Sequence, residues 1–89
     1  MEQLLQLLVD NPHLVIELGG HTDGTGDHEL NMELSEKRVA VVKEYLVEHG
    51  IEPDRLLLKA YGSTQPMASN ATEATRRMNR RVEVKIVHN

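Results

Sequence analysis

Hydrophobic residues alternate between two spacings along the 89-residue chain, and the alternation predicts an α+β fold. Helices are predicted over residues 1–10, 27–49 and 73–79, and strands over residues 13–20, 55–61 and 81–88. Asn11-Pro12 is expected to end the first helix and Gly50 the second. A strand, a long helix and another strand in succession favour a right-handed parallel crossover. We therefore expect one domain over residues 1–89, with a mixed sheet and helices packed on one face.

The last predicted strand alternates cleanly between apolar and charged residues. Its apolar side carries Val82, Val84 and Ile86, and its charged side carries Arg81, Glu83 and Lys85. Side chains of a strand point alternately to the two faces of the sheet. The pattern predicts that the apolar row packs on the helices and the charged row faces water.

The long helix carries an arginine inside an apolar row. Leu34, Arg38, Val42 and Leu46 follow one another at a spacing of four, and Leu30 extends the row backwards. A buried unpaired charge is costly, so this arginine must find an anion or reach water. It is either a structural group, paired with Asp23 or extended to solvent, or it joins Asp23 in receiving a ligand that carries an ammonium and a carboxylate.

Asp23 lies in a polar, glycine-rich turn, Gly19 to Gly26, between the first strand and the long helix. An α/β sheet places its ligands at such a turn, where backbone N–H groups point outward. The N–H groups of Thr22 and Gly24 are candidates to bind a carboxylate. Asn31 lies on the helix face of Arg38 and is expected to bond the ligand or the turn.

Composition and charge narrow the function classes. Aromatic residues make up 2% of the chain and cysteine is absent, so the core must be aliphatic and thiol chemistry is excluded. The net charge of −4 divides into −7 over residues 1–49 and +3 over residues 50–89. The basic cluster Arg76, Arg77, Arg80 and Arg81 raises the alternative of a nucleic-acid-binding module. That alternative is disfavoured because the cluster is short, lacks aromatic platforms and belongs to an acidic domain.

Catalytic and metal-binding motifs are also weak. No serine occurs in an elbow motif, and a hydrolase would have to rely on His21 and Asp23 to polarise water. The spacing of His21, Asp23, Asp27, His28 and Glu29 matches no standard metal-ligand set, so we expect neither a metal nor a cofactor. His21 is instead expected to make hydrogen bonds that fix the turn.

Several motifs together resemble the OmpA-like C-terminal domain family. They are Gly20-His21-Thr22-Asp23, Asn31, Leu34-Ser35 with Arg38, Tyr61-Gly62 and Asn79-Arg80-Arg81. The resemblance implies a non-enzymatic domain that binds peptidoglycan non-covalently. It implies that Asp23 and Arg38 hold diaminopimelate of the stem peptide. It also implies that Asn79 and Arg80 orient the loop of Asp23 or contact the stem peptide.

The resemblance carries further expectations about architecture and location. It implies a βαβαβ-type sandwich that lacks the family's first strand, leaving a bare sheet edge through which a homodimer can form. It implies a periplasmic domain that does not itself span a membrane. Such a domain is tethered to the outer membrane of a Gram-negative cell by a membrane-anchored region upstream. A peptidoglycan-modifying hydrolase remains the enzymatic alternative.

Overall fold

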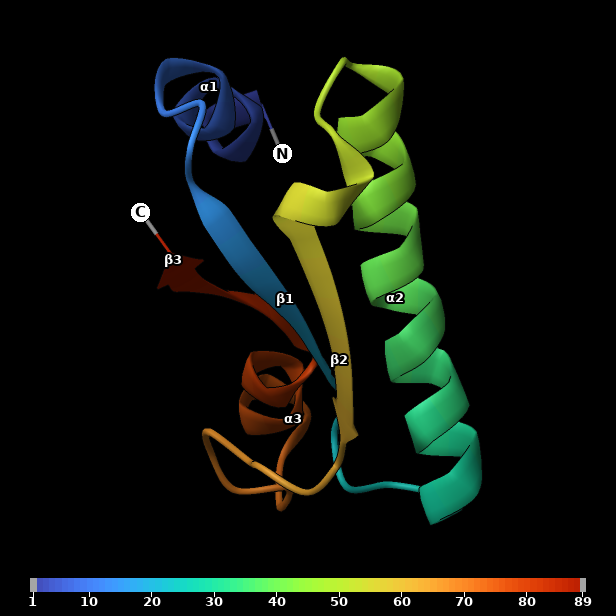
Figure 1. Ribbon diagram of the computed structural model, residues 1–89. Helices are drawn as coiled ribbons and strands as arrows, with labels where there is room; N and C mark the ends of the chain where they lie inside the picture. Colours follow the sequence, from blue (N-terminus) through green and yellow to red (C-terminus); the bar gives the residue numbers. More distant parts are fainter. Residues whose placement is uncertain (1, 89) are drawn as a thin grey trace.

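The computed structural model describes residues 2–88 as three α-helices, one 3₁₀ turn and three strands (Figure 1). In chain order they are α1 (Glu2–Asp10), β1 (Val15–His21), α2 (His28–Glu48), η1 (Pro53–Arg55), β2 (Leu56–Gly62), α3 (Glu73–Asn79) and β3 (Arg81–His88). The predicted α+β class is confirmed, and each predicted element forms within two residues of its expected bounds.

The three strands form one mixed sheet in the order β2-β1-β3. The central strand β1 runs parallel to β2 and antiparallel to β3. The long helix α2 connects the two parallel strands and runs alongside β2, while α1 and α3 lie at opposite ends of the sheet (Figure 1). The carboxyl end of β1 therefore emerges beside the start of α2, where the glycine-rich turn lies.

An aliphatic core lies between the sheet and α2, as the composition requires. Its buried members are Leu8, Leu14, Ile16, Leu18, Val39, Leu46, Ile51 and Leu56. Ile16 and Leu18 alternate along β1 because successive side chains point to opposite faces. Burying each such side chain contributes about 1.5–3 kcal/mol, so this small set supplies most of the force that holds α2 against the sheet.

Both ends of α2 are fixed by capping. The Asp27 carboxylate accepts the N–H groups of Glu29 and Leu30 at the N-terminus. At the other end Gly50 has a φ of +96°, and its N–H donates to the Val47 carbonyl at 3.1 Å. Ile51 donates to the Leu46 carbonyl at 3.0 Å, which completes a Schellman motif. These contacts therefore fix where the helix begins and ends.

The face of α2 that meets the sheet differs from the predicted apolar row. Leu30 and Leu34 are 63% and 44% exposed, whereas Ser35 and Val39 are buried. The reason is the close approach at Gly20, where a Cβ atom would lie 2.4 Å from the Ser35 carbonyl oxygen. Only glycine fits at position 20 of the strand, and the helix backbone lies against it. The helix row that faces the sheet therefore begins with the polar residues Asn31 and Ser35.

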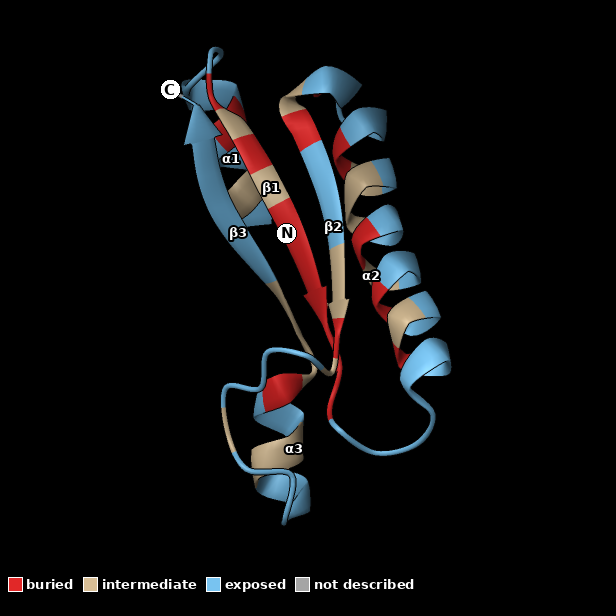
Figure 2. Ribbon diagram, turned by 60° about the horizontal axis from the view of Figure 1, so that its bottom comes forward, coloured by how far each residue is buried: buried red, intermediate tan, exposed pale blue. Residues whose placement is uncertain are grey.

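The apolar side of β3 is only partly covered. Val82 packs against the core, but Val84 and Ile86 are 44% and 57% exposed (Figure 2). The expectation that the whole row packs on helices is therefore wrong. Since α2 contacts β2 and β1, and β3 lies on the far side of β1, the helix does not reach this strand.

We predict that the domain self-associates at high concentration through β3. Within residues 2–88, β3 pairs with β1 along one edge and with no strand along the other. An unpaired edge with exposed apolar side chains is a template for pairing with another chain. Light scattering should show mass rising with concentration, and Ile86→Lys should suppress the rise. Val41→Lys, on an exposed position of α2, is the control. A monomer up to millimolar protein contradicts the prediction.

Candidate functional site

The Asp23 carboxylate lies just beyond β1 and is held from two sides. Its Oδ1 accepts the Thr25 N–H at 3.0 Å and the Thr25 hydroxyl. Its Oδ2 accepts Nη1 of Arg80 at 2.7 Å. The contact with the N–H two residues ahead is an Asx turn, in which the side chain stands in for a backbone carbonyl. The carboxylate thus has a fixed position although it belongs to a loop.

These donors lower the pKa of Asp23 to about 2, the Thr25 hydroxyl contributing most and its N–H and Arg80 adding to the effect. The group is therefore a carboxylate throughout the neutral range. A carboxylate offers about four acceptor positions, and the three hydrogen bonds described occupy three of them. Oδ2 keeps one position for a further donor.

Arg38 does not pair with Asp23. Its Nη1 donates to the backbone carbonyl of His21 at 3.0 Å, and the side chain is half-buried. No carboxylate within residues 2–88 lies at salt-bridge distance from this guanidinium. The structural alternative of an Asp23–Arg38 ion pair is therefore wrong, and the ion pair in the site is Asp23–Arg80.

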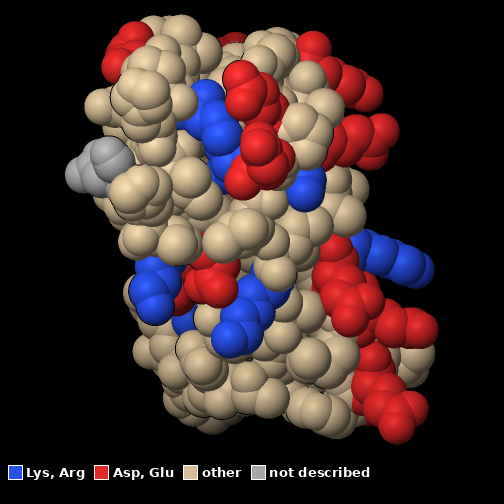
Figure 3. Space-filling model, in the orientation of Figure 1, with Lys and Arg blue, Asp and Glu red and all other residues tan. Residues whose placement is uncertain are grey.

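Arg80 bridges two acidic side chains. Besides Asp23 it bonds Glu73 at the start of α3, and Glu73 also accepts Nε of Arg76 at 3.3 Å. Figure 3 shows acidic and basic side chains gathered side by side on this face of the molecule. Three of the four arginines of the basic cluster, Arg76, Arg80 and Arg81, are thus paired with carboxylates, which leaves less positive charge for a polyanion.

The asparagines near α3 fasten the loops of the site to one another. Asn79 is fully buried, and its Oδ1 accepts the N–H groups of Met67 and Ala68 at 2.6 and 2.9 Å. Its Nδ2 donates to Asn70 Oδ1 at 2.9 Å, and the same oxygen accepts the Gly24 N–H at 2.9 Å. Asn79 therefore has a scaffold role in this structure, and the Gly24 N–H is not a free donor for a ligand.

Thr22 and Asn31 hold the turn in a similar way. The Thr22 N–H donates to the Gly62 carbonyl at 2.8 Å. Asn31 Nδ2 donates to the Thr25 carbonyl at 3.0 Å, so of its two expected roles it performs the one of bonding the turn. Of the seven residues expected in the site, Asp23, Arg38 and Arg80 bring charge, and the other four bond neighbouring parts of the chain.

Sequence reasoning missed three residues of this arrangement. They are Thr25, Asn70 and Glu73. The Asp-x-Thr spacing is a local signal for the Asx turn, and attention to it would have identified Thr25. Asn70 and Glu73 act across 46 and 7 residues respectively, on Gly24 and Arg80, and no local pattern marks either.

Comparison with known proteins identifies the family of this fold. The model of the OmpA family matches residues 1–80. The chain belongs to the OmpA family. Its match with outer membrane porin F of Pseudomonas fluorescens is 40% identical and covers 97% of the chain but 26% of the porin. The peptidoglycan-binding protein ArfA of Mycobacterium bovis is 41% identical over 82% of the chain and 22% of ArfA.

Among solved structures of the family's domains, the peptidoglycan-associated lipoprotein of Burkholderia pseudomallei superposes with a TM-score of 0.87 and 30% identity. The match covers 99% of this chain and 73% of that structure. The chain spans about a quarter of the length of the porin and of ArfA. Across residues 2–88, none of the helices of this OmpA-family domain has the length and apolar character needed to cross a membrane.

His21, the histidine of the family motif, behaves differently from expectation. Its ring is fully buried, but neither ring nitrogen has a hydrogen-bond partner within residues 2–88. The prediction that this side chain fixes the turn by hydrogen bonds is therefore wrong. The ring stacks on Tyr61 with 4.9 Å between centroids and 10° between planes, and the backbone carbonyl, not the ring, binds Arg38.

We predict that Thr25→Val raises the pKa of Asp23 from about 2 towards its ordinary value of 3.8. The substitution keeps the volume but removes the hydroxyl that contributes most to the lowering. Carboxyl carbon chemical shifts followed through a pH titration measure the effect. Thr64→Val, at an exposed threonine that bonds only the Tyr61 carbonyl, is the control. An unchanged Asp23 titration would show that the hydroxyl has no such role.

The same lowered pKa predicts a dependence of stability on pH. The folded state holds the Asp23 proton less tightly than the unfolded state, so the carboxylate stabilises the fold at pH values above about 4. This contribution should be lost as the pH falls from about 4 to about 2. Urea unfolding of the wild type and Asp23→Asn at several pH values tests it, since only the wild type should lose this component. Parallel curves for the two proteins would exclude it.

Proposed function

We propose that this domain binds peptidoglycan non-covalently at the carboxyl end of β1, through the diaminopimelate of the stem peptide. The observation that carries the proposal is the unmatched charge of Arg38, which is anchored on a backbone carbonyl two residues before the ionised Asp23. One guanidinium nitrogen of Arg38 is anchored on the His21 carbonyl, and no carboxylate of residues 2–88 neutralises it. The names of two relatives, a peptidoglycan-binding protein and a peptidoglycan-associated lipoprotein, support the same class of ligand.

The end of a diaminopimelate side chain carries an ammonium and a carboxylate on one carbon. In the proposed complex the ammonium donates to the remaining acceptor position on Asp23 Oδ2. The ligand carboxylate accepts from the guanidinium of Arg38, whose planar fork suits a carboxylate. Arg80 stays beside Asp23, keeps its carboxylate oriented and contacts the stem peptide from the other side.

Binding without turnover fits this site better than hydrolysis. A general base works best with a pKa near the operating pH, whereas that of Asp23 is about 2. His21 is buried with its ring stacked on Tyr61 rather than directed at Asp23. Incubation with purified sacculi separates the two classes. Co-sedimentation without release of soluble fragments supports a binding module, and release of fragments supports the hydrolase.

The wider role follows from binding. We propose that the domain anchors a longer envelope protein to the cell wall from the periplasm, tethered to the outer membrane by a membrane-anchored region upstream. The support is that the matched relatives, a porin of the outer membrane among them, are several times longer than this chain.

The sharpest test of the proposal is selectivity between stem peptides. Lysine lacks the extra carboxylate of diaminopimelate, so with a lysine-type peptide Arg38 would lose its anion. A charged hydrogen-bonding group left unpaired costs roughly 1.5–3 kcal/mol, which is about 10- to 150-fold in affinity. Calorimetry should show this preference in the wild type and its loss in Arg38→Met. Asp23→Ala should weaken both peptides, since both keep the ammonium.

A matched control is available in α3. Arg77→Met removes an exposed arginine that makes no ion pair within residues 2–88, so it should leave both affinities unchanged. Each variant must first give a wild-type circular dichroism spectrum, because Arg38 also braces the end of β1. Equal affinity of the wild type for the two peptides would remove Arg38 from this role.

A further inference from the structure

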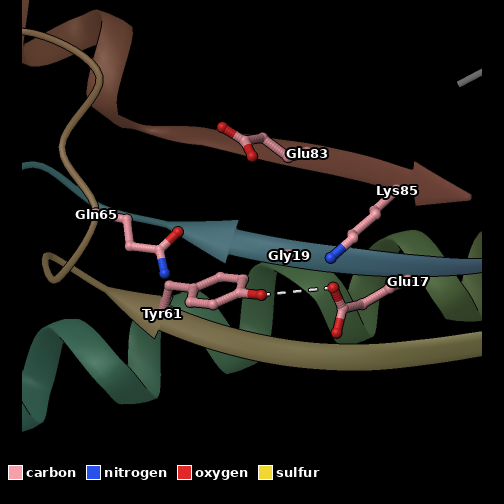
Figure 4. Close-up of a pocket in the computed structure, with 6 residues that line it drawn as sticks. All are labelled: Glu17, Gly19, Tyr61, Gln65, Glu83 and Lys85. Carbon is pink, nitrogen blue, oxygen red and sulfur yellow. Dashed lines mark hydrogen bonds between the residues drawn. The ribbon is translucent and has the colours of Figure 1, made fainter. Parts of the chain in front are cut away.

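A second concave site lies on the face of the sheet that α2 does not cover. It encloses about 180 Å³ and is lined by Glu17, Gly19, Tyr61, Gln65, Glu83 and Lys85 (Figure 4). These residues come from all three strands and from the loop after β2. None of them belongs to the set around Asp23, so this groove is distinct from the proposed stem-peptide site.

Gly19 and Tyr61 form the floor of the groove. A Cβ atom at Gly19 would lie 2.8 Å from Cε2 of Tyr61, so the ring can lie across β1 only because this residue is glycine. The Tyr61 hydroxyl points along the strand towards Glu17, at 3.4 Å from Oε2 (Figure 4). The sequence thus holds a polar-tipped aromatic ring at the base of the groove.

The buried His21 borders this floor. Its Nε2 lies 3.7 Å from Oε2 of Glu83 and is directed towards that groove residue, while neither ring nitrogen has a hydrogen-bond partner within residues 2–88. Burial and the nearby Arg81 lower the pKa of His21, so the ring is neutral and offers one donor and one acceptor. Buried polar atoms are normally paired. An unpaired histidine at the edge of a polar groove therefore indicates a ligand that supplies polar atoms there.

Charges of both signs surround the groove. Glu17 and Glu83 provide negative charge, Lys85 provides positive charge, Arg81 bonds Glu83 at 2.7 Å, and Lys59 lies 5.5 Å from the centre of the Tyr61 ring. No three metal-ligating side chains within residues 2–88 converge in a way that suits a metal ion. The lining is polar, which does not suit a lipid. The donors and acceptors together suit a neutral ligand with many hydroxyl groups.

We propose that this groove binds a neutral pyranose that carries hydroxyl and acetamido groups. Carboxylates of Glu17 and Glu83 accept hydrogen bonds from sugar hydroxyls, while Lys85 and the amide of Gln65 donate to hydroxyl and acetamido oxygens. The inference rests on the proposed function in one respect: the sugar is taken to belong to the glycan strand that carries the stem peptide. His21 links the two sites, because its carbonyl binds Arg38 and its ring borders the groove.

The experiment uses tri-N-acetylchitotriose, a neutral sugar without any peptide, as the probe. Titration into the ¹⁵N-labelled domain should cause saturable amide shift changes at Gly19, Glu83 and Lys85. Asp23→Ala should give the same changes, since it alters only the stem-peptide site. If no shifts appear up to about 20 mM sugar, any binding is too weak to matter, and the proposal is overturned. So would shifts confined to residues 22–26.

Paired variants test the assigned contacts. Glu17→Leu and Lys85→Met each remove one partner of the sugar and should raise its Kd at least about threefold, the effect of losing one hydrogen bond. Glu36→Leu, at an exposed position of α2, is the matched control and should leave the Kd unchanged. If a variant does not fold, the wild-type shift map still decides. Loss of stem-peptide selectivity with intact sugar shifts would count against the proposed function alone, and the reverse result against this groove alone.

Discussion

The contact between Gly20 and α2 sets the geometry of the whole domain. Without a side chain at Gly20, the Ser35 carbonyl comes so close that a Cβ atom there would lie 2.4 Å away. The Ser35 hydroxyl then accepts the Gly62 N–H at 3.1 Å, which binds the helix to both parallel strands. One turn further along, Arg38 reaches the His21 carbonyl. A larger residue at position 20 would move the helix outward and take the arginine away from the strand end.

A second constraint concerns the loops at the same end of the sheet. The Asp23 loop, the segment before α3 and the end of α3 come from distant parts of the chain, yet Asn70 Oδ1 accepts from both Gly24 and Asn79. Arg80 adds a bond across 57 residues to Asp23. Each of these long-range bonds requires the closure of a long loop, which costs conformational entropy. The site is thus completed by α3 and by the residue that follows it.

Sequence reasoning located the elements, the turn and the residue types of the site, because these depend on local periodicity, capping and turn chemistry. Thr75 illustrates how local this information is, since it forms a capping box with Thr72. The partner of Asp23 could not be found in this way. Arg38 and Arg80 both carry the right charge, and only the packed structure decides which one reaches the carboxylate. The exposure of Leu34 could not be predicted for the same reason. Which helix face meets the sheet depends on how the two elements pack together, and the sequence of the helix alone does not determine it.

The pairing of Asp23 with Arg80 rather than with Arg38 also affects how the site can discriminate between ligands. Because Arg80 already bonds Asp23, the carboxylate is not left as a buried unpaired charge when no ligand is bound. An incoming ammonium therefore adds a donor to a group that is already satisfied, and it gains less than it would from a bare carboxylate. Arg38 differs, since no carboxylate of residues 2–88 neutralises it. The contact with the ligand carboxylate is new to the complex, so under the proposed function selectivity depends mainly on Arg38, and Asp23 contributes an attraction that every ammonium ligand shares.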